Sequence, residues 1–236
     1  MELKLKKRPT SPIIIEGFPG LGFVGTIAVE YLIEHLQAER IGQIESKKIS
    51  PVAAIHNQQI MAPLGIFYAK KYNIVLVHAL SNIAGLEWDL AEIIAQLAKQ
   101  VKAKEIISLE GVSSPQPSEG TGLQSFFYTT KPNKKLTSLE ASELKEGIVM
   151  GVSGALLLKD KTTPITCIFS ETKSSLPDSR AAANVIQVID QYLGLKVDYK
   201  PLERKADEFE AKLKGLITQT KRAVDQKQKK DLDYFG

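Results

Sequence analysis

The sequence predicts an α/β protein, a three-layer sandwich with a mainly parallel or mixed central sheet. Several short β-branched runs, such as 12–16, 73–78 and 105–109, are continuously apolar, which is typical of strands buried on both faces. Segments between some of these runs repeat apolar residues at helical spacing. Buried strands joined by helices indicate a sheet covered on both faces.

The first elements follow the order strand, glycine turn, helix. Residues 12–16 form the expected strand, and the run 17–25 is rich in glycine. A helical pattern then continues to Leu36. A second strand is expected at 40–44, but strand-like segments follow it at 51–69 where regular alternation requires a helix.

The middle of the chain returns to alternation. After the strand at 73–78, residues 88–101 have helical spacing, with Asp89 early and Lys99 late to suit the helix dipole. The strand at 105–109 comes next. Residues 111–133 contain three prolines and three glycines, and we expect a long surface loop with one short aromatic strand at 126–128.

The last part of the main domain contains two further helices and a strand. A short helix is expected at 155–158 and a buried strand at 165–169. Asp178 is a suitable N-cap for a strongly amphipathic helix that Gly194 closes. We therefore expect a main domain over residues 1–198.

Composition changes at the C-terminal end. From Pro201 the chain is rich in Lys, Glu, Gln and Ala, and sparse apolar residues give an a/d seam over about three heptads. We expect an amphipathic helix over 199–230, which needs a partner surface because its apolar stripe is thin. The final residues, 231–236, form an expected flexible tail that ends on two aromatic residues and a glycine.

Composition also bounds the location and the partners. The chain has 236 residues, of which 43% are hydrophobic and 25% charged, as in ordinary folded proteins. Its one cysteine, Cys167, lies in an apolar run and is expected to be a buried free thiol. We find neither a signal-peptide pattern nor a membrane-span pattern, so we expect a cytoplasmic protein with no membrane partner. Residues 200–230 carry net charge +5, but acidic residues are mixed in and stacking aromatics are few, which makes nucleic acid an unlikely partner.

Gly20, Gly22 and Gly25 match the pattern G-x-G-x-x-G between a strand and a helix. One interpretation is a nucleotide-binding protein or enzyme that uses the turn at residues 17–25, with Glu45 receiving a ribose. Pro19 stiffens the loop, and Glu45 lies further along the chain than that pattern requires. The favoured interpretation is a tight, closely packed strand-to-helix turn, and we expect no bound cofactor.

Other polar residues give weaker signals. Ser153, in Gly151-Val152-Ser153-Gly154-Ala155, resembles a nucleophile elbow, but no histidine follows it in the chain. Glu16, Glu110 and Glu171 each lie near the end of an expected strand, where sites of open α/β sheets gather. The three histidines, at positions 35, 56 and 78, are dispersed. We expect no catalytic residue and no metal site.

Four segments together resemble one family. They are Gly17-Phe18-Pro19-Gly20-Leu21-Gly22-Phe23-Val24-Gly25, Glu110-Gly111, Gly147-Ile148-Val149-Met150-Gly151-Val152-Ser153-Gly154 and Leu176-Pro177-Asp178 before an Ala-rich helix. Over residues 10–230 the chain resembles the archaeal homologues of the second eukaryotic proteasome-assembly chaperone.

The resemblance implies a fold similar to that of nucleoside phosphorylases, a homo-oligomer with a tetramer favoured among closed states, and no catalysis. It also implies binding to proteasome α-subunits, as an assembly chaperone or adaptor, through a C-terminal tail. Tyr234, Phe235 and Gly236 match that tail pattern, with Phe where Tyr is usual.

Overall fold

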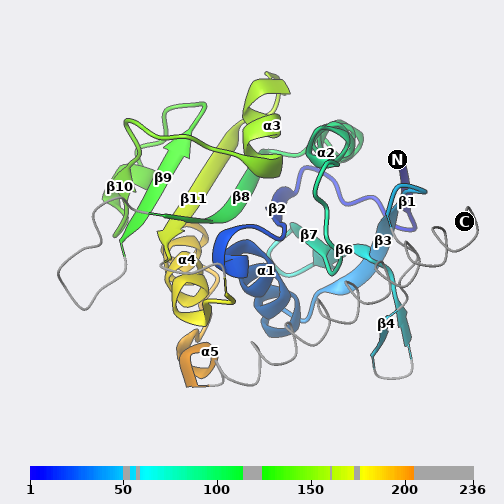
Figure 1. Ribbon diagram of the computed structural model, residues 1–236, viewed down its shortest axis with the longest axis horizontal. Helices are drawn as coiled ribbons and strands as arrows, with labels where there is room; N and C mark the ends of the chain where they lie inside the picture. Colours follow the sequence, from blue (N-terminus) through cyan, green and yellow to red (C-terminus); the bar gives the residue numbers. More distant parts are fainter. Residues whose placement is uncertain (50–53, 57–58, 114–123, 160, 173–175, 205–236) are drawn as a thin grey trace, which may run out of the picture.

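The computed structural model describes residues 1–49, 54–56, 59–113, 124–159, 161–172 and 176–204. The described chain forms a nine-stranded sheet in the order β1-β3-β6-β7-β2-β8-β11-β9-β10, and a separate two-stranded hairpin (Figure 1). Helices cover both faces of the large sheet, which confirms the predicted α/β class and its three layers.

Four neighbouring parallel strands form the centre of the sheet. They are β7 (Ile74–Ala79), β2 (Ile13–Gly17), β8 (Glu105–Val112) and β11 (Ile165–Glu171). Nearly all of their residues are buried, because helices pack on both sides, and this explains why their sequences are continuously apolar. Cys167 lies in β11 and is fully buried, as predicted.

The outer strands make the sheet mixed. On one side β6 (Leu64–Ala69) is antiparallel to β7, and β3 (Glu39–Glu45) and β1 (Glu2–Leu5) follow it, each antiparallel to its neighbour. On the other side β9 (Ser125–Thr129) is antiparallel to β11 and β10 (Ser142–Glu143) is parallel to β9. The hairpin consists of β4 (Ala54–His56) and β5 (Gln59–Met61), within the segment where the sequence departs from alternation.

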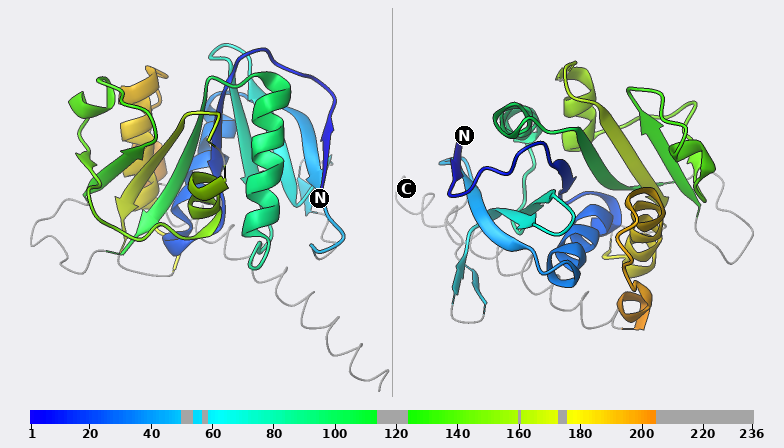
Figure 2. Two further views of the ribbon diagram at one scale, coloured as in Figure 1. Left: turned by 90° about the horizontal axis from the view of Figure 1, so that it is seen from above. Right: turned by 180° about the vertical axis from the view of Figure 1, so that it is seen from behind.

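Two helices cover each face of the sheet (Figure 2). One face carries α1 (Val24–His35) and α4 (Ser179–Leu193), which pack on each other and on the central strands. The opposite face carries α2 (Glu87–Val101) and α3 (Gly151–Lys159), which also pack together. Two 3₁₀ turns, η1 (Leu21–Phe23) and η2 (Leu136–Ser138), complete the connections. Of the described helices, none is long and apolar enough to cross a membrane.

The predicted caps of α4 are confirmed. The Asp178 side chain accepts a hydrogen bond from the backbone N–H of Ala181 at 3.0 Å, as an N-cap does. Gly194 ends the helix in the left-handed conformation, with φ of 69°.

The first residues of the helix expected over 199–230 are helical in the structure. A short helix, α5 (Lys200–Arg204), packs against α4 and buries Leu202 completely. The heptad pattern beyond Arg204 and the tail lie outside the described residues. The division at residue 198 and the tail boundary therefore stay predictions.

Candidate functional site

The glycine turn, the ends of β2 and β8, and the beginning of α3 meet at one edge of the sheet (Figure 1). This is the carboxyl edge of the parallel strands, beside the point where the connections from β2 and β7 diverge to opposite sides. Open α/β sheets place their ligands at such a point. This edge of the sheet is therefore the candidate functional site.

Four polar side chains form a continuous hydrogen-bonded chain here, which we call the carboxyl cluster: Glu16, Ser108, Ser153 and Glu110. The Ser108 hydroxyl donates to Oε1 of Glu16 and also contacts the Ser153 hydroxyl. Ser153 Oγ donates to Oε1 of Glu110 at 2.5 Å. Two carboxylates predicted to lie at strand ends are thus joined through two serines.

Two carboxyl groups share this buried cluster, and a proton on one of them removes a charge that burial disfavours. Glu16 is 1% exposed and burial raises its pKa to about 8, with the nearby charge of Glu110 acting in the same direction and the Ser108 hydrogen bond against it. Glu16 is therefore the group that carries the proton near neutral pH.

Glu110 is the more open end of the cluster. Burial raises its pKa to about 7, and the hydrogen bonds from the side chain and backbone of Ser153 oppose that rise. Its carboxylate lies beside the first turn of α3, where the helix dipole favours negative charge. The cluster thus ties the beginning of α3 to the ends of β8 and β2.

Ser153 does not form a nucleophile elbow. It is the third residue of α3 and is fully buried, as is Ser108. A hydroxyl enclosed in this way and bonded to a carboxylate holds the helix in place, and it has no open side for a substrate to approach. Glu171, at the end of β11, is also buried.

The glycines of the turn pack against protein atoms. A Cβ on Gly25 would lie 2.0 Å from the carbonyl oxygen of Leu109, and one on Gly22 would lie 2.8 Å from Oγ1 of Thr172. Gly22 also has φ of 63°, and its carbonyl accepts a hydrogen bond from the backbone N–H of Asp178 at 2.9 Å. The Cβ directions of these two glycines are thus occupied by the end of β8 and by Thr172, the residue after β11, which supports the interpretation as a tight packing turn.

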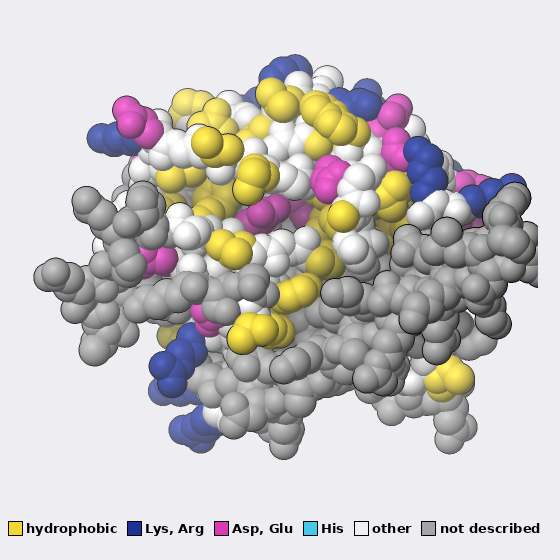
Figure 3. Space-filling view, in the orientation of Figure 1, with side chains coloured by type: hydrophobic (Ala, Val, Ile, Leu, Met, Phe, Trp, Pro, Cys, Tyr) yellow, Lys and Arg dark blue, Asp and Glu magenta, His cyan; other side chains and the backbone are white. Residues whose placement is uncertain are grey.

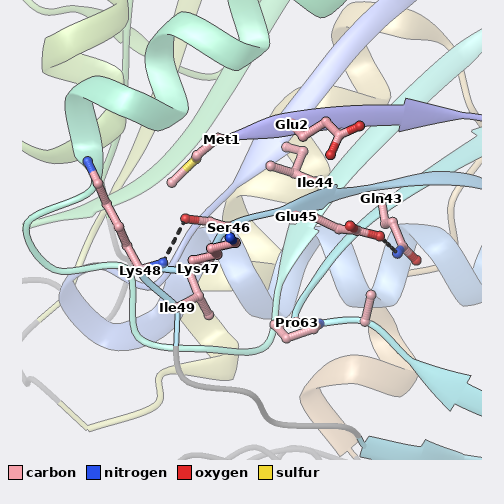
Figure 4. A pocket seen from close by; sticks show the side chains of 11 residues that line it. Met1, Glu2, Gln43, Ile44, Glu45, Ser46, Lys47, Lys48, Ile49 and Pro63 are labelled. Carbon is pink, nitrogen blue, oxygen red and sulfur yellow. Dashed lines mark hydrogen bonds between the residues drawn. The ribbon is translucent and has the colours of Figure 1, made fainter.

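The ribose candidate, Glu45, lies far from that turn. It ends β3, and two strands, β6 and β7, separate β3 from β2. Its carboxylate accepts hydrogen bonds from Lys4 and Gln43, both at 2.6 Å. Figure 4 shows it in a separate pocket of about 780 Å³ between the end of β3 and the N-terminus. The nucleotide interpretation thus loses its acidic partner.

Among the described residues no group of three or more His, Cys, Asp or Glu side chains could hold a metal ion. Tyr234, Phe235 and Gly236 lie outside the described residues, so their predicted role stays a prediction.

Sequence reasoning missed Ser108, although a signal was present. In β8 the apolar run is interrupted by Ser108 and then by Glu110, two residues apart, so both side chains lie on the same face of the strand. A small polar residue inside a buried strand requires a partner. Pairing it with Glu16 would have required knowing that β2 and β8 are neighbours.

The sequence and the structure were compared with known proteins. Residues 14–217 match the sequence profile of the PAC2 family. The Methanocaldococcus jannaschii protein MJ0106 is 28% identical over 218 residues, which cover 92% of this chain and 90% of that protein.

Solved structures from Pyrococcus furiosus have the same fold. Pyrococcus furiosus PbaA, described as an archaeal homolog of proteasome-assembly chaperone, superposes with a TM-score of 0.82 at 32% identity, covering 94% of this chain and 99% of its own. Pyrococcus furiosus PbaB, described as an archaeal proteasome activator, superposes with a TM-score of 0.74 at 22% identity, covering 91% of this chain and 98% of PbaB. The likeness to PbaB concerns the fold alone.

Proposed function

The chain belongs to the PAC2 family, and from that premise we propose that it is a proteasome-binding assembly chaperone or adaptor. The observation that carries the proposal is the likeness to PbaA, which extends over nearly the whole of both chains. A likeness of that extent concerns the whole domain, since the backbones superpose with a TM-score of 0.82. The function proposed is binding, with no reaction catalysed.

The enclosed carboxyl cluster supports a role without catalysis. Its two serines are fully buried, and the glycine turn above it is packed against β8 and β11. Buried hydroxyls that are bonded to carboxyl groups hold elements of the fold together. We therefore favour binding over the nucleotide or enzyme alternative.

The docking element we propose is the tail Tyr234-Phe235-Gly236, and its target is the α-subunits of the proteasome core particle. Two aromatic side chains supply much contact area for a short segment, and a terminal carboxylate can pair with a lysine in a pocket. The preceding Lys- and Gln-rich segment separates the tail from the main domain along the chain.

A single tail would bind weakly, because fixing a short segment in a pocket costs conformational entropy. We propose that the protein is a homo-oligomer, with a tetramer favoured among closed states. Several tails that face a ring of equivalent pockets would raise the effective concentration, and the gain in affinity would be on the order of 100-fold or more.

Gel filtration with α-subunit rings from the same organism tests the proposal. The full chain is expected to migrate with the rings, and a variant lacking residues 234–236 is expected to migrate alone. Circular dichroism and light scattering on both proteins provide the control, since fold and mass should be equal. Unchanged co-migration of the truncated protein would exclude the tail as the docking element, and no co-migration of either protein would oppose proteasome binding altogether.

A further inference from the structure

A groove lies between α3, β9 and the segment that joins β10 to α3. Its volume is about 640 Å³. The residues that line it are mostly aliphatic, aromatic or basic: Tyr128, Thr130, Lys131, Leu144, Lys145, Gly147, Val149, Gly154, Leu157, Leu158, Lys161 and Thr163. No acidic residue is among these described lining residues, so the groove combines apolar walls with positive charge.

The apolar part of the groove is open to solvent. Tyr128 and Leu158 are 40% and 67% exposed, and Leu144, Val149 and Leu157 are partly buried beneath them. Beside the groove, Ile148 and Met150 are 88% and 75% exposed. Figure 3 shows hydrophobic side chains gathered over α3 and toward β9. Exposed apolar side chains grouped in this way mark a docking surface.

Two lysines of the groove make no ion pair with the described residues. Lys131 and Lys145 have no carboxylate within 4.0 Å among the described residues, and their side chains are exposed. The ammonium group of Lys161 donates to the carbonyl oxygen of Leu157 at 3.1 Å, at the end of α3. The occupant that this surface fits is therefore short, apolar and acidic.

We propose that the last six residues of the same chain, Asp231-Leu232-Asp233-Tyr234-Phe235-Gly236, occupy this groove. They carry two aspartates, and three of the other side chains are large and apolar. The segment just before them is Lys- and Gln-rich, so the basic groove selects the acidic end of the chain and repels what precedes it.

The length of the chain permits this contact. The last described residue is Arg204, and 26 residues, 205–230, separate it from Asp231. A segment of that length spans about 39 Å as a helix and up to about 85 Å when extended. Attachment to the same molecule also raises the effective concentration of the tail at the groove.

The consequence concerns regulation and rests on the proposed function. Tyr234 and Phe235 cannot fill an α-subunit pocket while they lie in their own groove. The groove is thus a self-inhibitory site that competes with the proteasome for the tail, and the tail is released when α-subunits offer stronger pockets.

Fluorescence anisotropy with a labelled peptide tests the contact without any proteasome subunit. The peptide is residues 231–236 with a free carboxylate, and the protein is a variant that ends at Lys230. Saturable binding is expected, and it should weaken as ionic strength rises because exposed charges are screened. The full chain should bind the same peptide at least about tenfold more weakly, because its own tail occupies the groove. Equal affinity for the truncated and full chains would overturn the proposal, as would no binding to either.

Charge reversal with a matched control assigns the site. The variant K131E/K145E of the truncated chain is expected to lose about tenfold or more in affinity for the peptide, since two attractive contacts become repulsive. The control K104E/K134E makes the same change in net charge at two exposed lysines that do not line the groove. Equal losses in both variants would show a nonspecific charge effect and would refute the site.

Two further measurements separate this proposal from the proposed function. In the full chain, K131E/K145E should migrate with α-subunit rings at least as well as the parent, because the tail is freed. A loss of proteasome binding in that variant would contradict self-inhibition. If the full chain binds the peptide more weakly as the protein concentration rises, the groove is occupied by the tail of a second copy. That result would overturn the assignment to the same chain.

Discussion

Ser153, near the start of α3, donates a hydrogen bond of 2.5 Å to Oε1 of Glu110, near the end of β8. The two residues are 43 positions apart, and Ser153 also contacts Ser108, which donates to Glu16 on β2. One helix and two central strands are thus connected by a polar network of two carboxyl groups and two hydroxyl groups. Networks of this kind stabilise one arrangement when all of their members are satisfied.

The network predicts that stability falls as the pH rises. Burial raises the pKa of Glu16 from 4.5 to about 8. Between pH 4.5 and pH 8 the folded protein therefore keeps a proton that the unfolded chain has lost. The stabilisation is therefore fully present below pH 4.5 and is lost as the pH approaches 8. Replacing Glu16 by Gln keeps the oxygen that accepts from Ser108 and removes the titration. The slope of the unfolding free energy between pH 5 and 8 should become less negative by about 1.4 kcal/mol per pH unit.

Urea denaturation at several pH values measures that slope. The variant Glu146→Gln makes the same chemical change at an exposed position, and its slope should match the parent. A parent protein whose stability is constant from pH 5 to 8 would show that Glu16 does not retain a proton.

The serine at the centre of the network predicts a loss of stability on truncation. Ser153→Ala removes the donor to Glu110 and the partner of Ser108 in a fully buried location. Leaving a buried polar group unsatisfied costs about 1–3 kcal/mol, and the unfolding free energy should fall by that amount. Ser142→Ala, at an exposed position of β10, should change it by less than about 0.5 kcal/mol. Equal effects of the two substitutions in chemical denaturation would contradict the role of the network.

The glycine turn predicts unequal effects of alanine substitutions. A Cβ on Gly25 would lie 2.0 Å from a backbone oxygen of β8, so Gly25→Ala should cost roughly 3 kcal/mol or more. A Cβ on Gly20 would lie 3.6 Å from Glu110 Oε2, an ordinary contact, and φ of Gly20 is −143°. Gly20→Ala should therefore stay within about 1 kcal/mol of the parent. Thermal unfolding of both variants measures this difference, and equal losses of stability at the two positions would contradict the packing role.

The sequence was most informative where one physical signal dominated. The apolar runs of β2, β7, β8 and β11 are long enough to identify buried strands, and Asp178 and Gly194 mark the ends of α4 by their own backbone preferences. The beginning of α3 was placed too late, at Ala155 instead of Gly151. Small residues with weak helix propensity, including Gly151 and Gly154, form its first turns because tertiary contacts hold them.

The site was less predictable because it depends on strand order. Glu16 and Glu110 were singled out separately, but only the adjacency of β2 and β8 brings them to the same two serines. The strands β1 and β10 were missed since each is short and largely polar, as edge strands often are. Sequence periodicity reports burial along one segment and carries no information about which segments become neighbours.

The proposed docking through several tails predicts a cooperative loss of binding in mixed oligomers. If full chains are combined with chains lacking residues 234–236, each oligomer carries a variable number of tails. Because avidity multiplies the contributions of individual tails, binding to α-subunit rings should fall more steeply than the fraction of full chains. Differently tagged chains, mixed in known ratios before assembly and measured by surface plasmon resonance on immobilised rings, give this dependence. A mixture of two differently tagged full chains controls for the effect of mixing itself. A strictly linear decrease, or a mass of 26.0 kDa for the protein in light scattering, would show that single tails act alone.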